Sequence, residues 1–282
     1  MPILGAHMSI AGGLDKAVER ATQADCQALQ IFTKNSNQWR AKDITAERAE
    51  GFRQAVVQAS LKHLVAHDSY LINLASPNDT LWKRSIDAFV DELRRADLLG
   101  IPFVVTHPGA YTESSEKRGI RRIIRALNEV HRQTRDLSAK CLLETTAGQG
   151  TCLGWKFEQL AAILDGVKEP DRLDVCFDTC HVFAAGYPMG AERDYRQTMR
   201  EFNRLIGVKR IRVFHVNDSR RELGSRVDRH AHIGRGEMGL EPFQHLLKDR
   251  RFRKVPMILE TPKGTEDGVD LDQLNLNTLR GL

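Results

Sequence analysis

The stretch that decides the fold is SIDAFVDELRRADLLGIPFVVTHPG, residues 85–109. Its first part, Ser85–Leu99, carries apolar residues at helical spacing, and Gly100 followed by Pro102 predicts the end of that helix. The apolar run Phe103–His107 comes next and predicts a short buried strand. One helix and one strand are thus joined by a tight turn. The strand ends in a histidine that a glycine-containing loop follows.

The same unit recurs along the whole chain, because short apolar runs alternate with helix-like segments such as Ile120–Val130. The predicted strands are Ile3–His7, Ala28–Phe32, His63–His67, Phe103–His107, Cys141–Glu144, Leu173–Asp178, Ile211–His215 and Met257–Glu260. This alternation is typical of parallel strands, and eight units in about 260 residues match a (β/α)8 TIM barrel. No linker or internal repeat divides the chain, so we expect an α/β protein with a single domain over residues 1–282.

Composition is that of an ordinary globular protein, with 41% hydrophobic and 28% charged residues and a net charge of +5. The mild positive charge is compatible with a polyanionic partner. No apolar run is long enough for a transmembrane helix, and the start MPILGAHMSIAGG resembles a strand rather than a signal peptide. Five cysteines without a CxxC pair argue against both disulfides and a zinc ribbon. We therefore expect a protein of the reducing cytoplasm without membrane contact. A monomer is the default, because the sequence says nothing about oligomeric state.

Side chains that bind metals stand at the ends of the predicted strands, where the active sites of TIM barrels lie. Six strands end in such a residue: His67, His107, Glu144, Asp178, His215 and Glu260. His7 ends the first strand in the same way, and we expect it to support a ligand. Histidines of an ordinary core have no reason to stand at the strand exit each time. The pattern predicts a metal site at the mouth of the barrel.

Two further segments add candidate ligands. In DTCH, Asp178 and His181 both reach the mouth, although Asp178 could instead cap a helix and leave His181 exposed. In the loop GSRVDRHAHIGRG, a spacing of two places Asp228 and His230 on one side of an extended chain. His232 repeats this spacing, so spacing alone does not choose between the two histidines. Nine ligands exceed what one zinc ion needs, which predicts two or three ions.

Imidazole and carboxylate ligands without thiolate suit zinc, with manganese or iron as alternatives. Two such ions, about 3.5–4 Å apart, stabilise the attacking and leaving oxygens of a phosphodiester, and zinc lowers the pKa of bound water to about 7. These residues therefore predict metal-assisted hydrolysis of a phosphate ester. Several cations are expected near the site, where they would contact phosphates or would only form a solvated rim. They are Lys34, Arg40, Lys42, Arg220, Arg221, Arg226, Arg229 and Arg235.

A nucleotide cofactor is not expected. Gly234, Gly236 and Gly239 spell GxGxxG, but a dinucleotide site should follow a strand and open a helix, whereas this segment follows the DRH loop late in the chain. The chain contains no Walker A pattern and no GxSxG elbow.

Longer segments carry a resemblance to a known family. They are GAHMSIAGG, FTKNSNQWR, HDSYLINLASP, HPGAY, ETTAGQGTCLG, DTCHVFAAGY, HVNDSRRELGSRVDRHAHIGRG and ILETP, which run from residue 5 to residue 262. In these segments the chain resembles endonuclease IV, the zinc-dependent apurinic/apyrimidinic endonuclease family. The resemblance implies a TIM barrel with three zinc ions, with manganese as an alternative at some sites. It also implies cleavage of duplex DNA 5′ to an abasic site, which leaves a 3′-hydroxyl, by a zinc-bound hydroxide.

The resemblance also implies a role for each residue. Glu144 is the catalytic carboxylate that bridges two zinc ions. His67 and His107 complete the ligands of the first ion, and Asp178, His215 and Glu260 complete those of the second. His181, Asp228 and His230 bind the third ion. This chooses His230 over His232. Residues implied to contact DNA are Asn37, Tyr70, Leu71 and Arg229, with Tyr70 and Leu71 inserting at the lesion. The chain departs from the family at Asn37, where an arginine is usual, and at Thr145, where an asparagine is common.

Two other functions compete with this interpretation. Metal-dependent sugar isomerases and epimerases use similar barrels, but they usually need only one or two ions. The group His181, Asp228 and His230 argues against them. A DNA-damage binding protein with structural zinc would be favoured by the loss of ligands, and none is lost here.

Overall fold

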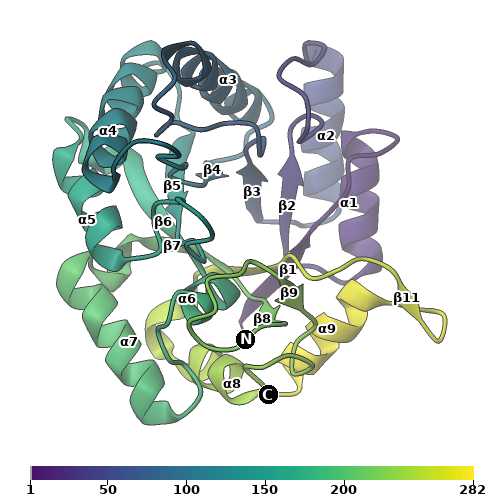
Figure 1. The fold of residues 1–282 in the computed structure, drawn as a ribbon. Helices are drawn as coiled ribbons and strands as arrows, with labels where there is room; N and C mark the ends of the chain where they lie inside the picture. Colours follow the sequence, from purple (N-terminus) through teal and green to yellow (C-terminus); the bar gives the residue numbers. More distant parts are fainter. Residues whose placement is uncertain (1) are drawn as a thin grey trace.

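Eight parallel strands form a closed barrel in the computed structural model, which describes residues 2–282 (Figure 1). In ring order they are β1 (Ile3–His7), β2 (Ala28–Phe32), β3 (His63–His67), β4 (Phe103–Thr106), β5 (Lys140–Glu144), β6 (Leu173–Asp178), β7 (Ile211–His215) and β10 (Pro256–Leu259). The β10 strand pairs with β1 and closes the ring. The predicted (β/α)8 barrel is confirmed, and each strand begins and ends within one residue of its predicted bounds.

Helices surround the barrel and connect its strands (Figure 1). They are α1 (Leu14–Gln23), α2 (Ala46–Gln58), α3 (Asp79–Leu98), α4 (Glu116–Gln133), α5 (Phe157–Gly166), α6 (Thr179–Ala184), α7 (Glu192–Leu205), α8 (Glu241–Lys248) and α9 (Leu271–Arg280). Both helices predicted from apolar spacing begin earlier than predicted. The reason is the cap: Asn78 and Ser115 accept backbone hydrogen bonds at the first turns of α3 and α4, and those turns contain no buried apolar side chain.

Short elements complete the fold. Single turns of 3-10 helix, η1 (Pro170–Arg172), η2 (Val208–Arg210) and η3 (Arg250–Phe252), precede β6, β7 and β10. Two small antiparallel hairpins follow β7 and β10, namely β8 (Asp218–Ser219) with β9 (His230–Ala231), and β11 (Thr265–Glu266) with β12 (Val269–Asp270). Among residues 2–282, no helix has the length and apolar character needed to cross a membrane.

The interior of the barrel is packed by one apolar side chain from each of seven strands. These are Ala28, Val65, Val105, Leu142, Cys176, Val213 and Ile258. Because side chains alternate across a strand, the residue two positions later points into the same interior, nearer the mouth. Those residues are Gln30, His67, His107, Glu144, Asp178, His215 and Glu260. The same alternation of side chains that places apolar residues in the barrel core therefore also directs the polar side chains into the mouth.

In β1, the position that faces the barrel interior and is apolar in the other seven strands is occupied by Gly5. A Cβ at Gly5 would lie 1.9 Å from the backbone oxygen of Ala28, so only glycine lets β1 and β2 approach this closely. A second, larger apolar cluster lies between the barrel and its helices and includes Phe89 and Phe202. Cys141 and Cys176 are buried free thiols, as expected.

Candidate metal centre

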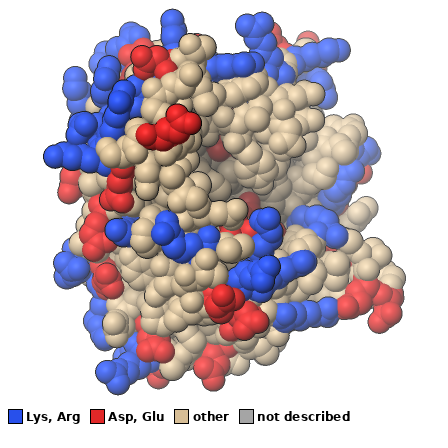
Figure 2. All heavy atoms as spheres, viewed as in Figure 1, with Lys and Arg blue, Asp and Glu red and all other residues tan. Residues whose placement is uncertain are grey.

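The mouth of the barrel is hollowed at its centre, and acidic side chains lie in its depth with Lys and Arg around the rim (Figure 2). The hollow is formed by the carboxyl ends of the strands, where the site was expected.

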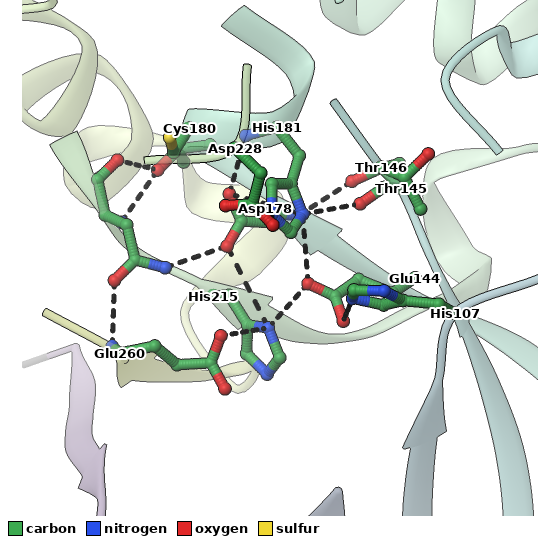
Figure 3. A network of polar contacts seen from close by, with 12 residues as sticks. His107, Glu144, Thr145, Thr146, Asp178, Cys180, His181, His215, Asp228 and Glu260 are labelled. Atoms are coloured by element: carbon green, nitrogen blue, oxygen red, sulfur yellow. Dashed lines mark hydrogen bonds and ion pairs between the residues drawn. The ribbon is translucent and has the colours of Figure 1, made fainter. Parts of the chain in front are cut away.

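Glu144 lies at the centre of this site and is fully buried. Its Oε2 atom is 3.2 Å from His67 Nε2 and 3.1 Å from His107 Nε2. Its Oε1 atom is 3.0 Å from His215 Nδ1. The two oxygens of one carboxylate therefore face two different groups of histidines, which is the geometry of a bridging ligand (Figure 3).

The second group of ligands gathers around His215. Its Nδ1 atom lies 3.2 Å from Glu260 Oε2 and 3.9 Å from Asp178 Oδ2, in addition to its contact with Glu144. Figure 3 shows His215 between Glu260 and Glu144. Ligand atoms of these four residues all lie within 4.8 Å of one another, so one ion could contact them all.

The third group comes from α6, from the loop before β9 and from β9 itself. His181 Nε2 is 3.2 Å from Asp228 Oδ2 and 3.4 Å from His230 Nε2. His230 Nε2 is 3.5 Å from Asp228 Oδ1 and 3.8 Å from Asp178 Oδ2, so Asp178 lies between the second and third groups. His232 is directed elsewhere, toward the side-chain amide of Asn275 at 3.0 Å. Of the two histidines that spacing left open, His230 faces the cluster.

These separations fit zinc. Ligand bonds of 2.0–2.2 Å in a tetrahedral site place neighbouring ligand atoms about 3.3–3.6 Å apart. The ring nitrogens of His181 and His230, at 3.4 Å, and the contacts of Asp228 with both rings fall in or near this range. Imidazoles and carboxylates without a thiolate are also ligands that zinc and manganese accept.

The orientation of the histidine rings gives independent support for a metal site. In four of the five histidines, the second ring nitrogen lies near a carbonyl oxygen, which can only accept a hydrogen bond. The pairs are His67 Nδ1 with Asp68 O at 2.9 Å, His181 Nδ1 with Thr145 O at 2.9 Å, His230 Nδ1 with Glu260 O at 3.1 Å, and His215 Nε2 with Gln30 Oε1 at 2.8 Å. In the neutral ring that nitrogen carries the proton, so the other nitrogen, which faces the cluster, is the one that can bind a metal, as in metal-binding histidines.

The charges of the cluster favour ionised carboxylates. Burial alone would raise the pKa of Glu144, but His215 and His107 hold that pKa well below its usual value. Glu260 behaves in the same way, with the effect of burial on its pKa outweighed by His215 and by a hydrogen bond to His7. Burial likewise opposes protonation of His67, yet Glu144 raises the pKa of this imidazole to about 9, so a metal ion that binds its Nε2 atom would displace a proton. The carboxylates therefore stay anionic, as metal binding needs.

Two residues that support the ligands were missed in the sequence. Gln30 Nε2 donates to Glu260 Oε1 at 2.6 Å, while its Oε1 accepts from His215. Asn217 Nδ2 donates to Asp178 Oδ2 at 2.8 Å. A signal existed for both, because each stands two positions after an inward residue, Ala28 and His215 respectively. His7, expected to support a ligand, lies 3.4 Å from Glu260.

The two interpretations of DTCH are partly compatible. Asp178 caps α6, since its Oδ1 accepts a hydrogen bond of 2.7 Å from the backbone N–H of His181. Its Oδ2 nevertheless faces the cluster. His181 is only 2% exposed, so the alternative of an exposed histidine is wrong.

The residues expected to contact DNA lie on the rim of the mouth. Tyr70 is 61% exposed, and its ring packs against the rings of Phe32 and His67. Leu71 beside it is partly buried, and Asn37 is exposed in the loop after β2. These two loops are joined by Ser69, whose hydroxyl donates to Ser36 O at 2.6 Å. Arg229 is exposed next to Asp228.

One of the expected surface cations is not at the surface. The Lys34 side chain is 1% exposed and lies 3.0 Å from both Asp91 and Glu92 of α3, so its prediction as a phosphate contact is wrong. Arg40, Lys42, Arg220 and Arg221 are exposed as expected. Arg235 pairs with Glu266.

The GxGxxG segment holds a carboxylate of the chain itself. Backbone N–H groups of Gly236 and Met238 donate to Asp218 at 2.9 and 3.0 Å. A Cβ at Gly236 would lie 2.5 Å from the same carboxylate, which explains a glycine there. Two donors of this loop are thus occupied by Asp218, while the N–H groups of Arg235 and Glu237 donate to backbone oxygens of His232 and Ser219.

Comparisons with known proteins agree with this geometry. A family model described as xylose isomerase-like TIM barrel matches residues 18–279. A relative from Geobacter sulfurreducens, named probable endonuclease 4, is 54% identical over 99% of this chain and 94% of its own length. The solved endonuclease IV from Thermus thermophilus has a TM-score of 0.85 at 37% identity, covering 99% of this chain and 98% of that one. A D-tagatose 3-epimerase-like protein, with a TM-score of 0.74 at 19% identity over 98% of this chain and 96% of its own, shares the fold alone. The chain therefore belongs to the endonuclease IV family of xylose isomerase-like TIM barrels and is an enzyme of the nuclease class.

Proposed function

We propose that this enzyme hydrolyses the phosphodiester 5′ to an abasic site in duplex DNA and leaves a 3′-hydroxyl. In this proposal three zinc ions, with manganese as an alternative at some sites, are held by the nine ligands at the mouth. One observation carries it: four histidines hold one ring nitrogen against a carbonyl oxygen and direct the other ring nitrogen at a cluster lined by carboxylates. The family name of the relatives supports nuclease activity.

The residues divide the work between them. Glu144 would bridge two ions, because its oxygens face separate histidine groups, while Asp178 lies between the second and third groups. When bound, zinc would lower the pKa of a water molecule and offset the charge of the phosphate in the transition state. Gln30 and Asn217 would keep Glu260 and Asp178 in place through their hydrogen bonds.

Access to a phosphodiester inside a duplex requires displacement of nucleotides, which is least unfavourable at a damaged site. Tyr70 is suited to fill the gap, since an aromatic ring that is 61% exposed can stack in place of the missing base. Leu71 follows it in the same loop, and Asn37 and Arg229 line the rim beside the duplex.

The competing sugar isomerase or epimerase function does not account for the third group. Such enzymes need one or two ions, whereas His181, Asp228 and His230 form a further set with separations that fit another ion.

The test is to incubate the zinc-loaded protein with a short duplex that carries one abasic site, labelled on the damaged strand. We expect one cut, on the 5′ side of the lesion, with a product end that a polymerase can extend. The same duplex without the lesion is the control. Cleavage on the 3′ side, or equal cleavage of both duplexes, would contradict the proposal.

A further inference from the structure

The positive charge of this protein is concentrated on one helix. Residues 116–135, which comprise α4 and the two residues after it, contain seven Lys or Arg and two Glu, a formal charge of +5. The formal charge of the whole chain is also +5, so the rest of the molecule is neutral in sum. The exposed cations between Glu116 and Arg125 of α4 are Lys117, Arg118, Arg121 and Arg125, called here the α4 stripe.

The stability of the helix does not explain the α4 stripe. Cations near a helix N-terminus oppose the helix dipole, and like charges three or four positions apart repel each other. Within residues 2–282, none of the four side chains has an ion pair, whereas Arg122 and Arg132 of the same helix pair with Asp79 and Glu129. Arg125 lies 5.6 Å from the ring of Trp82, a contact that leaves its charge without an anionic partner. Four mutually repelling cations in this position are consistent with an anionic partner outside the chain.

The α4 stripe begins beside the mouth. α4 follows β4 through the loop that carries His107, so its first turn lies at the same end of the barrel as the metal centre. Gly119 of α4 packs against Tyr111 of that loop. Figure 2 shows Lys and Arg gathered over α4 at the upper left, in the same view as the hollow.

We propose that the α4 stripe binds the phosphate backbone of undamaged duplex where it leaves the mouth. This inference rests on the proposed function, because the abasic site in the mouth defines where the flanking duplex runs. Lys117 to Arg125 spans about 12 Å along the helix axis, which matches about three or four phosphates of one strand. Arginine suits the role, since its planar group forms paired hydrogen bonds with phosphate.

The test uses the variant R118Q/R121Q/R125Q, in which glutamine keeps helix propensity and removes repulsion, so the fold is retained. The matched control is R200Q/K248Q/R250Q, which removes three exposed cations from α7, α8 and η3 on another side of the barrel. Binding to an undamaged duplex of about 30 base pairs is measured by fluorescence anisotropy at several salt concentrations. We expect the α4 variant to bind about tenfold or more weakly at low salt, with a salt slope lower by about 2–3. The control should keep the wild-type slope.

The outcomes separate the two proposals. Cleavage of a duplex of about ten base pairs with one abasic site needs only the mouth, so the α4 variant should retain its kcat there. Equal binding and equal salt slopes for wild type and α4 variant would overturn the α4 proposal and leave an acidic protein as the partner to seek. A similar loss in both variants would also overturn it, as an effect of net charge alone. Failure of the wild type to cleave the short abasic duplex would contradict the proposed function instead.

Discussion

At the scale of single residues, Glu144 is the side chain with the largest expected effect. Glu144→Gln removes the charge and leaves only one oxygen, so the two groups of histidines lose their shared ligand. We expect kcat on abasic duplex to fall by at least about two orders of magnitude, together with the zinc content. Elemental analysis and single-turnover cleavage measure both. The matched control is Glu158→Gln on exposed α5, and near-normal activity of Glu144→Gln would contradict the bridging role.

His131 makes the stability of the fold sensitive to acid. It is 2% exposed, and among residues 2–282 neither ring nitrogen has a hydrogen-bond partner. Burial, with a contribution from Arg172, lowers its pKa to about 4, while the unfolded value is about 6.5. Between these values the unfolded state binds a proton that the native state does not. Stability is therefore lost as the pH falls from about 6.5 to about 4, by up to about 3 kcal/mol.

We expect His131→Leu to remove this acid sensitivity. Urea unfolding should give a larger gain in stability over wild type at pH 5 than at pH 7, because the wild type carries the protonation penalty only at the lower pH. An equal gain in stability at pH 5 and pH 7 would indicate that the two proteins differ in packing and not in the protonation of His131.

How far single residues could be predicted depended on where their partners lie in the chain. The positions of the strand-end histidines and carboxylates follow from one period-two pattern and one fold rule, so the structure places them together at the mouth. Burial of Lys34 could not be predicted, because it depends on Asp91 and Glu92 of a helix far along the chain. Gln30 was overlooked for a different reason: an amide at a strand end was not recognised as support for a ligand.

At the scale of elements, the loops determine the position of the third ligand group. Arg226 has a positive φ of 56°, lies 4.2 Å over the ring of Trp155 and donates to Gly148 O at 3.0 Å. The N–H of Asp228 donates to the Gln149 side chain at 3.2 Å in the same loop after β5. These contacts clamp the segment that carries Asp228 against the neighbouring loop, which offsets the backbone strain at Arg226.

We expect Trp155→Leu to loosen that clamp and weaken zinc binding by the third group. After dialysis against a mild chelator, the variant should retain about two ions where the wild type retains about three. Trp39→Leu is the matched control. Trp39 lies in the loop after β2, away from Asp228, and the guanidinium group of Arg84 stacks over its ring at 4.3 Å. Equal zinc retention in all three proteins would show that the stack does not position Asp228.

Asn37 belongs to the loop after β2, which a hydrogen bond joins to the loop of Tyr70. Asn37→Arg adds reach and a phosphate-seeking cation, so binding to abasic duplex should tighten, and the gain should shrink as salt rises. Gln58→Arg adds the same charge at the end of α2 and serves as control. Unchanged binding at low salt by a folded Asn37→Arg protein would place residue 37 away from the DNA.

Elements differed in how well the sequence predicted them. Strand bounds followed closely from apolar runs, because a buried parallel strand is apolar on both faces. The starts of α3 and α4 did not, since a first turn without a buried apolar side chain is recognised by its cap and not by apolar spacing. The hairpin of β8 and β9 contains two residues per strand, too few to show a period, yet it carries His230 to the mouth.

At the scale of the whole molecule, the proposed ions connect elements from most of the ring. Their ligands come from β3, β5, β6, β7, α6 and β9, from the loop before β9 that carries Asp228, and from the residues directly after β4 and β10. Apart from β1 and β2, every barrel strand therefore contributes to the cluster. Any ion bound there stabilises only the closed barrel, because the unfolded chain cannot bring these ligands together.

Removal of the metal should therefore destabilise the whole barrel and not the loops alone. We expect chelator treatment to abolish cleavage and to lower Tm, with both restored by added zinc. A site held at a free zinc concentration about 100 times its dissociation constant contributes about 2.7 kcal/mol to stability. Loss of several ions should then shift the urea midpoint of the cooperative transition. The double variant D228N/H230Q, which retains the first two groups, should bind about two ions and show a smaller Tm shift on chelation. If chelator left the Tm of the wild type unchanged, the hydrogen bonds of the barrel mouth alone would hold it together. Metal binding would then not contribute to the stability of the fold.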